Sequence, residues 1–519
     1  MRPWFIAFVL FTAATQPAPA PRPQFADPDR RVKLATAFAD IDRIFTEFAR
    51  TVHAPGAAWG IVIDGELAHA GAAGVRDIKS DAAVDADTVF RIASMTKSFT
   101  AMAILKLRDD GKLSLDDPAE RYVPELKGLR YPTTDSPRIT VRHLLTHSAG
   151  FPEDNPWGDQ QLSESEEEFS RMLREGIPFS NPPGVAYEYS NYGFAILGRV
   201  VSQASGMPYD QYVSQAILQP LGMRSTTLHP SRVPADKVAV GYRWEDERWK
   251  EEPALPHGSF GAMGGMLTSI RDLSRYVSAF LDAWPAHDGP EAGPVRRSSL
   301  REMQQPWRPS GMRVVRDSST NATHLTAASY GYGLSVTRTC DFRAIVAHSG
   351  GLPGYGSLMR WLPDYGVGII AFGNVTYTGW NRVVGEAIDR LARTGGLQPR
   401  EVRPSAALDA ARDNVSRLIL RWDDGLAEKI AAENLFLDRS KDRRREEIED
   451  LRSKVGACAA PDSFDIVENA LRGQWTMSCE RGKLQVAITL APTMPPSVQY
   501  LSVRPAPAEP QPGGPCTSF

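Results

Sequence analysis

The chain has 519 residues, of which 42% are hydrophobic and 23% are charged. This composition is typical of a globular protein, and the length allows two or three domains with a large core. A formal net charge of -3 gives no reason to expect nucleic acid or an anionic membrane as a partner. Beyond the N-terminus, no apolar run approaches the roughly 20 residues that a membrane-spanning helix needs.

Residues 1–20 have the pattern of a secretory signal peptide. A basic start at Arg2 precedes an apolar run and a final Ala18-Pro-Ala20. We therefore expect an exported protein, periplasmic or secreted, and a buried N-terminal segment is the alternative. Pro21 disfavours cleavage directly after Ala20, so the cleavage site stays open. Residues 21–30 are rich in proline and predict a linker.

Residues 31–398 predict one α+β domain. Apolar residues recur at helical spacing over 32–48, and a hairpin is indicated over 56–70. The remaining signals are helical patterns over 194–203 and 272–280 and strand patterns over 345–347, 358–361 and 367–372. Strands at both ends with helices between them predict an antiparallel sheet formed by both ends of the domain and packed with a mostly helical middle.

Two charged stretches interrupt this domain. Residues 153–180 are acidic and poor in strand signals, which predicts a surface insertion. Trp244 and Trp249 lie in the second stretch, where they either wall a pocket or pack in the ordinary way.

Residues 405–505 predict a small C-terminal α+β module. Helical patterns cover 410–420 and 441–454, and apolar residues alternate over 471–490. No catalytic residue types gather in this module, so its role is open, and contact with the cell wall is one expectation. Residues 506–519 form a proline-rich tail.

None of the four cysteines forms a C-x-x-C pair, so the sequence supports neither a zinc site nor a redox motif. Export would allow disulfides. Cys458 and Cys479 flank one short β-like region and are the predicted pair. Cys340 could be a buried free thiol, and Cys516 lies in the proline-rich tail.

Ser94 and Lys97 are the strongest candidate catalytic residues. Lys97 is the only lysine with a serine three residues before it, and a mostly apolar run follows. At the start of a helix this spacing places the hydroxyl and the amine on one face. A lysine in an apolar pocket loses its proton more easily and can activate the serine.

Two further motifs carry suitable groups. In Tyr189-Ser-Asn191 the phenol next to a buried lysine could be held as a phenolate, and the Asn amide could bind a substrate amide; a surface turn is the alternative. In His348-Ser-Gly350-Gly351 the backbone N–H groups could donate to an oxyanion; a strand end with a tight turn is the alternative. His147 is expected to support a loop.

In order and spacing these motifs resemble the serine β-lactamase and penicillin-binding-protein superfamily. The nearest branch is the class C-like group of D-aminopeptidases, D-Ala-D-Ala carboxypeptidases and β-lactamase-like esterases. The resemblance covers about 31–398 and rests on Ser94-Met-Thr-Lys97, Leu144-Leu-Thr-His147-Ser-Ala-Gly150, Pro183-Gly184, Tyr189-Ser-Asn191, Pro220-Leu-Gly-Met223, Gly264-Gly-Met-Leu-Thr-Ser-Ile-Arg-Asp-Leu273 and His348-Ser-Gly-Gly-Leu-Pro-Gly354.

The resemblance implies a role for each motif. Ser94 would be the acylated nucleophile, and Lys97 and Tyr189 the proton-transfer pair. Asn191 and His348 would line the substrate site, with Gly350 beside them. The N–H groups of Ser94 and Gly351 would form the oxyanion hole. No metal or cofactor is implied.

One departure bears on the substrate. The lactamases carry Lys-Thr-Gly at the third motif, and His348 replaces that lysine here. An ordinary histidine is mostly neutral at pH 7 and is a weaker partner for a substrate carboxylate. We therefore expect an exported serine hydrolase that acts on small esters, amides or D-amino-acid peptides. The alternatives are a true β-lactamase, a D-Ala-D-Ala carboxypeptidase, or a non-catalytic penicillin-binding-type scaffold or sensor. A Ser-His-Asp triad is not supported, because no G-x-S-x-G elbow is present.

Overall fold

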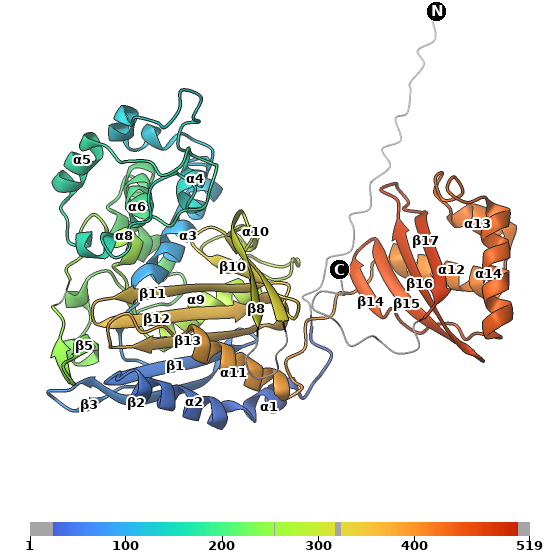
Figure 1. The fold of residues 1–519 in the computed structure, drawn as a ribbon, viewed down its shortest axis with the longest axis horizontal. Helices are drawn as coiled ribbons and strands as arrows, with labels where there is room; N and C mark the ends of the chain where they lie inside the picture. The colour runs from blue at the N-terminus through green and yellow to red at the C-terminus, as the bar shows by residue number, and fades with distance from the viewer. Residues whose placement is uncertain (1–23, 254, 317–322, 507–519) are drawn as a thin grey trace, which may run out of the picture. The chain divides into compact units, whose positions relative to one another are not determined.

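The computed structural model describes residues 24–253, 255–316 and 323–506 (Figure 1). The chain divides after Arg400 into two compact units. The predicted signal peptide and almost all of the proline-rich tail lie outside the described residues. No described helix has both the length and the apolar character needed to cross a membrane.

The first unit is built on a nine-stranded antiparallel sheet in the described part of the chain. Its two halves come from opposite ends of the unit, because β1 pairs with β13. In spatial order the strands are β3 (Ala82–Ala83), β2 (Glu66–Asp77), β1 (Gly56–Ile63), β13 (Val367–Gly373), β12 (Tyr355–Leu362), β11 (Ile345–Leu352), β10 (Ser335–Arg338), β9 (Thr323–Tyr330) and β8 (Arg308–Arg316).

The central strand β1 is buried on both faces and separates two cores. Trp59, Ile61 and their alternate neighbours pack with the terminal helices α1 (Arg30–Ala35), α2 (Phe38–Thr51) and α11 (Asn381–Arg393). Ala58 and Val62 point the other way, into the core of the helical middle. Successive side chains of a strand face opposite sides of a sheet, which explains this division.

The helical middle surrounds α3 (Thr96–Asp109), whose residues 96–105 are all buried. The other helices of this part are α4 (Val141–Leu145), α5 (Glu166–Glu175), α6 (Asn191–Ser205), α7 (Tyr209–Val213), α8 (Gly261–Gly264), α9 (Ile270–Asp282) and α10 (Arg297–Met303). Single turns are η1 (Ala93–Met95), η2 (Ala119–Arg121), η3 (Pro124–Gly128), η4 (Gly158–Gln161), η5 (Ser214–Leu218), η6 (Pro230–Arg232), η7 (Ala235–Lys237) and η8 (Pro363–Tyr365). Two small two-stranded sheets complete this part of the described chain. One pairs β4 (Phe90–Arg91) with β7 (Leu267–Thr268), and the other is the hairpin of β5 (Tyr242–Glu245) and β6 (Arg248–Glu251).

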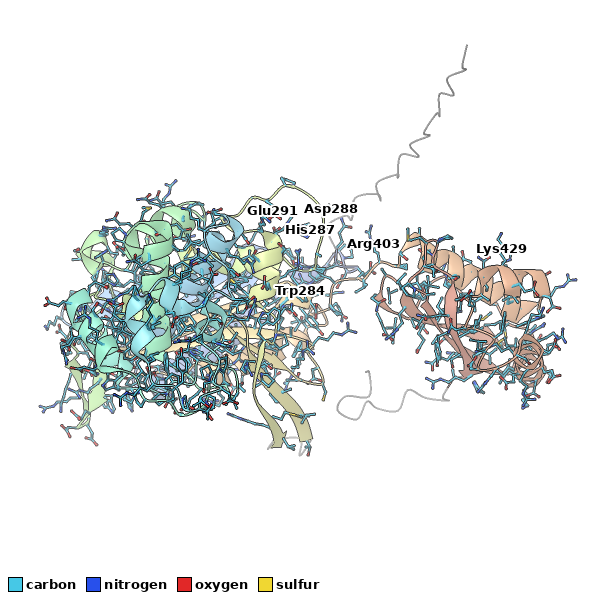
Figure 2. The ribbon with its side chains drawn as sticks, turned by 90° about the horizontal axis from the view of Figure 1, so that it is seen from above. Trp284, His287, Asp288, Glu291, Arg403 and Lys429 are labelled. Atoms are coloured by element: carbon cyan, nitrogen blue, oxygen red, sulfur yellow. A yellow bond between two sulfur atoms is a disulfide. The ribbon has the colours of Figure 1, made fainter. Side chains whose placement is uncertain are left out.

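Side-chain bonds hold the segment that follows α9. The Trp284 indole N–H donates to the Asp364 carboxylate at 2.7 Å, and the His287 ring bonds Arg297 at 2.7 Å. Figure 2 labels Trp284 and His287 in this segment. Trp244 and Trp249 face each other across the β5–β6 hairpin, and Trp244 stacks on His53, so they pack in the ordinary way.

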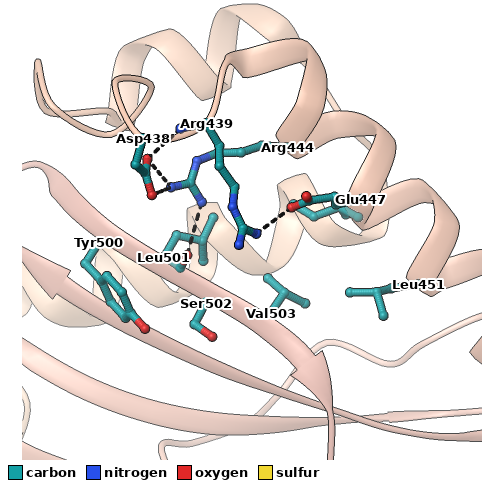
Figure 3. Close-up of a pocket in the computed structure, with 10 residues that line it drawn as sticks. Asp438, Arg439, Arg444, Glu447, Leu451, Tyr500, Leu501, Ser502 and Val503 are labelled. Carbon is teal, nitrogen blue, oxygen red and sulfur yellow. Dashed lines mark hydrogen bonds and ion pairs between the residues drawn. The ribbon is translucent and has the colours of Figure 1, made fainter.

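The second unit has three helices and a four-stranded antiparallel sheet in its described residues: α12 (Ala406–Leu420), α13 (Asp424–Ile430), α14 (Lys441–Val455), β14 (Ile466–Asn469), β15 (Arg472–Cys479), β16 (Gly482–Leu490) and β17 (Val498–Pro505). Its core gathers around Trp475, which is fully buried. A pocket of about 150 Å³ lies between α14 and β17, where Arg444 bonds Asp438 and the Leu501 carbonyl (Figure 3).

The predicted α+β class is confirmed, and so is the disulfide between Cys458 and Cys479. Other expectations were wrong. Cys340 is disulfide-bonded and is not a free thiol. The end of the predicted linker is packed on the first unit, because Arg30 is buried, bonds Asp64 at 2.7 Å and lies over the Phe25 ring. Strands β8, β9 and β10 were missed by the sequence reading.

Candidate active site

Ser94 lies in the turn η1, between β4 and the buried helix α3. The preceding residue, Ala93, has φ = 48°, a left-handed conformation that a non-glycine residue rarely adopts. Such strain is tolerated only where the surrounding structure holds it, and it is typical of functional sites. The turn presents Ser94 to a pocket of about 480 Å³.

Lys97 follows one turn later and is completely buried. Its Nζ lies 3.0 Å from Ser94 Oγ, 2.6 Å from Asn191 Oδ1 and 2.8 Å from the Met263 carbonyl oxygen. Burial lowers the pKa of Lys97 to about 7, against the opposing effect of the nearby Asp159 and Asp154 carboxylates. The amine is therefore easily deprotonated near neutral pH.

The direction of the Nζ lone pair in neutral Lys97 follows from its three hydrogen-bond partners. A carbonyl oxygen only accepts hydrogen bonds, so Met263 and Asn191 must each receive an N–H. A neutral amine has two N–H groups, and both are then used. Its lone pair remains for the Ser94 hydroxyl, the one partner that can donate.

Tyr189 stands beside this pair, with Lys97 Nζ 4.8 Å from its ring centroid. Burial raises the pKa of Tyr189 well above its ordinary value, although the Ser94 hydroxyl acts in the opposite direction. The phenol is therefore neutral in this site. This differs from the phenolate suggested by the sequence, and it makes Lys97 the better proton acceptor.

His147 supports the loop segment that carries Tyr189. Its Nδ1 accepts from the Ser190 backbone N–H at 3.1 Å, and its carbonyl accepts from the Glu188 N–H at 2.8 Å. Its ring centroid lies 4.4 Å from that of Tyr189. These contacts give His147 the loop-supporting role expected of it.

Asn191 does not line the pocket, contrary to expectation. Its side chain is completely buried, and its two ends bond Lys97 and Asn155 Oδ1, the latter at 2.6 Å. Asn191 begins α6, where Ser190 caps the helix, so the amide is fixed beneath the pocket. It therefore holds Lys97, while Asn155 lines the pocket in its place.

The third motif lies at an open strand edge. Strand β10 pairs only with Ile345–Ala347 of β11 in the described sheet, so residues 348–352 extend beyond it. Close packing requires small residues here. A Cβ on Gly350 would lie 2.1 Å from the carbonyl oxygen of Ile92, which precedes the Ser94 turn, and one on Gly351 would lie 2.7 Å from the Tyr377 ring. N–H groups on this edge can point into the pocket.

His348 is neutral. Burial and the nearby Lys97 lower its pKa to about 3. Nδ1 lies 2.6 Å from the Ser349 carbonyl oxygen and must donate to it, so Nε2 accepts from the Tyr330 hydroxyl at 2.9 Å.

The pocket also has residues that the sequence reading missed. Among the described residues it is lined by Ser94, Asn155, Pro156, Asp159, Tyr189, His348, Ser349, Gly350, Gly351 and Tyr377. Asn155, Pro156 and Asp159 come from the stretch predicted to be a surface insertion. No single-sequence pattern marks them, because their position depends on how that loop folds back over α6.

Comparisons with known proteins identify the family of this chain. A family model described as "Beta-lactamase" matches residues 41–394. The chain belongs to the β-lactamase family. This confirms the predicted membership of the serine β-lactamase and penicillin-binding-protein superfamily, a superfamily with serine hydrolase members.

The curated relatives are distant. Protein flp of Staphylococcus aureus (strain MW2) is 26% identical over 341 residues, which cover 64% of this chain and 62% of flp. A β-lactamase of Lysobacter lactamgenus is 27% identical over 70% of this chain and 92% of its own length. Penicillin-binding protein 4* of Bacillus subtilis (strain 168) is 25% identical over 68% of this chain and 76% of its own length.

The solved structure of an octameric penicillin-binding protein homologue from Pyrococcus abyssi aligns with a TM-score of 0.58. The two chains are 22% identical, and the alignment covers 88% of this chain and 96% of the homologue. At that identity the likeness concerns the fold alone.

Proposed function

We propose that the protein is a serine hydrolase that works through an acyl-Ser94 intermediate on small esters, amides or D-amino-acid peptides. The observation that carries this proposal is the contact between Ser94 Oγ and the buried Lys97 Nζ at 3.0 Å. Burial brings the pKa of Lys97 to about 7, so a large share of the amine is unprotonated at neutral pH. A serine hydroxyl with such a base beside it is an activated nucleophile.

In the first step neutral Lys97 takes the Ser94 proton while Oγ forms a bond to the substrate carbonyl carbon. The carbonyl oxygen becomes an oxyanion, which the N–H groups of Ser94 and Gly351 stabilise. A lost donor of this kind costs about 3–4 kcal/mol in other hydrolases. The bond to the leaving group then breaks, and the proton passes to that group from Lys97, with the Tyr189 hydroxyl as a relay. Water hydrolyses the acyl-serine and regenerates the hydroxyl.

The two narrower alternatives require recognition of a substrate carboxylate. β-Lactams and peptides that end in D-Ala both carry one, and a lysine or arginine on the pocket wall is the usual partner. Among the residues described, no lysine or arginine lines the pocket. His348, at the position of the lactamase lysine, is held neutral by burial. These observations favour the esterase and aminopeptidase branch over a β-lactamase or a carboxypeptidase.

A non-catalytic scaffold is disfavoured because the nucleophile, the buried amine and the strand edge are all in place. We also propose export, on the signal-peptide pattern of residues 1–20 and on the disulfides, which persist in oxidising compartments. Contact of the second unit with the cell wall is a further proposal, which follows from export.

The test is intact-protein mass spectrometry of the wild type and the Ser94→Ala variant with p-nitrophenyl acetate, nitrocefin and D-Ala p-nitroanilide. We expect an acyl adduct with the ester in the wild type alone, and turnover reduced about 10⁴-fold or more by the substitution. Rapid hydrolysis of nitrocefin would favour the β-lactamase. No adduct and no turnover with any compound would favour the scaffold.

A further inference from the structure

Asp159 is the one acidic residue among the described residues that line the catalytic pocket. It is an acid with only 3% of its surface exposed, and it belongs to the short turn η4. Within the described chain its carboxylate accepts one side-chain hydrogen bond, from the Tyr377 hydroxyl at 3.0 Å. An ionised carboxylate has about four acceptor positions, so most of its capacity is unused.

The neighbouring acid, Asp154, shows what a satisfied carboxylate looks like in the same loop. Its two oxygens accept from the backbone N–H groups of Asn191 and Tyr192, at 2.7 and 2.8 Å, at the start of α6. Asp154 therefore has a structural role as a helix partner. Asp159 has no comparable set of donors among the residues that the structure describes, although burying a carboxylate without partners is costly.

Tyr377 fixes the position of Asp159 relative to the reacting atoms. Its ring lies against Gly351, the expected oxyanion donor, and its hydroxyl reaches Asp159. The carboxylate is thus within the length of one tyrosine side chain of the strand edge that would hold the substrate carbonyl. A substrate in this pocket would place a group opposite Asp159.

We propose that Asp159 binds a positively charged amine close to the scissile carbonyl, so that the preferred substrates are amino-acid esters or amides with a free amino group. The inference rests on the proposed acyl-serine chemistry and narrows its substrate class. An ammonium group supplies the donors that the carboxylate lacks, and the pocket wall offers it no competing lysine or arginine among the described residues.

The rival role for Asp159 is to tune Lys97, whose pKa it raises. The two roles can be distinguished by the ratio of the kcat/KM values for two substrates that differ only in the amine. D-Alanine phenyl ester and phenyl isobutyrate differ by an ammonium group in place of a methyl group. A second pair, 3-(aminomethyl)phenyl acetate and 3-ethylphenyl acetate, places the amine on the leaving group. Any effect through Lys97 acts on both members of a pair and cancels in the ratio of their kcat/KM values.

We expect the wild type to prefer the amine in at least one pair, and Asp159→Asn to reduce that preference about 10- to 100-fold, the range for a hydrogen bond to a charged group. Asp154→Asn is the matched control: it removes the same charge near Lys97 and should leave the ratio unchanged. Thermal melting checks that each variant is folded. No preference in either pair, or a preference that survives Asp159→Asn, would overturn the inference. Phenyl isobutyrate tests the proposed function separately, because it has no amine and its Ser94-dependent turnover needs no amine site.

A second observation, independent of the catalytic pocket, concerns Asp210, His229 and His257. Each offers one ligand atom, and these atoms lie within 4.8 Å of one another. His229 Nε2 is 2.8 Å from Asp210 Oδ2, while Arg232 reaches the same oxygen only at 4.0 Å. Asp210 and His257 line a pocket of about 510 Å³ that would admit an ion and its water ligands.

We propose that these three residues bind a divalent transition-metal ion such as Zn²⁺. Two imidazoles and one carboxylate form a common protein ligand set for zinc and its neighbours, with at least one position left for water. His257 lies against Gly261 at the start of α8, the helix whose Met263 carbonyl holds Lys97. An ion here would therefore fix the helix that supports the catalytic lysine.

The test is titration of the untagged, metal-free protein with Co²⁺, followed by its visible absorption bands, and with Zn²⁺ by calorimetry. We expect one ion per chain and an affinity at least about tenfold weaker in His229→Ala. His69→Ala is the matched control, because His69 bonds Asp42 at the same 2.8 Å and has no third ligand within the described part of the chain. No binding by the wild type, or equal affinity in wild type and His229→Ala, would overturn the proposal.

Discussion

Two lysines in the two units show how differently this chain uses the same side chain. Lys97 on α3 is completely buried, with its three partners fixed in the core. Lys454 on α14 has 67% of its side chain exposed and bonds Asp450 one turn away at 2.7 Å. The first arrangement lowers the pKa of the amine to about 7; the second is an ordinary surface pair.

The surroundings of the two helices explain this contrast. Helix α3 is buried on all sides over residues 96–105, and its first turn buries several polar residues. Helix α14 buries only Arg444, Ile448 and Val455. Burying a polar group is costly unless the group is paired. The buried polar residues at the start of α3 therefore indicate a functional site, whereas the charged residues of α14 are typical of a solvent-exposed helix face. Changing each region should therefore affect a different property.

The largest effect is expected from Lys97→Met, which keeps most of the length of the side chain and removes the base. We expect kcat/KM for p-nitrophenyl acetate to fall about 10⁴-fold, the upper end of general-base effects, because in the proposed mechanism Lys97 both orients Ser94 and takes its proton. Steady-state kinetics measure this, and thermal melting shows whether the fold survives. A loss below tenfold in a folded variant would contradict the assigned base.

Trp475→Ala should affect stability and leave the chemistry alone. Trp475 is fully buried in the core of the second unit, and truncation of such a residue costs about 3 to 5 kcal/mol. Urea unfolding with a probe in each unit should show the loss in the second unit only. A matching fall in kcat/KM for a small ester would show that the second unit contributes to catalysis.

The sequence predicted the parts of this site that are local. Ser94 and Lys97 are one turn apart, and the apolar run after them marks a buried helix, so their contact follows from helix geometry. The two ends of the main sheet were found because β1 and β13 are short, apolar and flanked by turns. β8 to β10 were missed because polar and small residues interrupt their alternation.

Contacts between distant segments could not be predicted in the same way. Asp159 becomes a pocket residue through Tyr377, 218 positions later. Asn191 was expected to touch the substrate. Its side-chain N–H instead donates to Asn155 Oδ1, and Asn191 lies beneath the pocket. Burial of this kind depends on how loops pack over the core, which a single sequence does not reveal.

The pH dependence of kcat/KM for a neutral ester should have a rising limb near pH 7. Lys97 must be unprotonated to accept the proton, so activity is present above its pKa of about 7 and falls as the pH drops through that value. Between pH 7 and pH 5 the loss is about 50-fold if this amine is the base, because half of the amine is already protonated at its pKa. His348 stays neutral throughout, with a pKa of about 3.

The neighbouring carboxylates provide the check on that assignment. Asp159 and Asp154 both raise the pKa of Lys97 and have their own pKa raised by burial. Asp159→Asn should therefore move the rising limb to lower pH. A limb that stays in place, or moves to higher pH, would assign the titration to another group.

The smallest effect is expected at Lys454, the exposed member of the comparison. Lys454→Met removes a pair with Asp450 whose side chains are 67% and 57% exposed. Pairs at this helical spacing contribute about 0.3 to 0.5 kcal/mol, and salt screens them further. Urea unfolding at low and high salt should give a difference from wild type that nearly vanishes in high salt. A loss above about 1 kcal/mol would be more than such an exposed pair accounts for, and would mean that burial alone does not separate the two lysines.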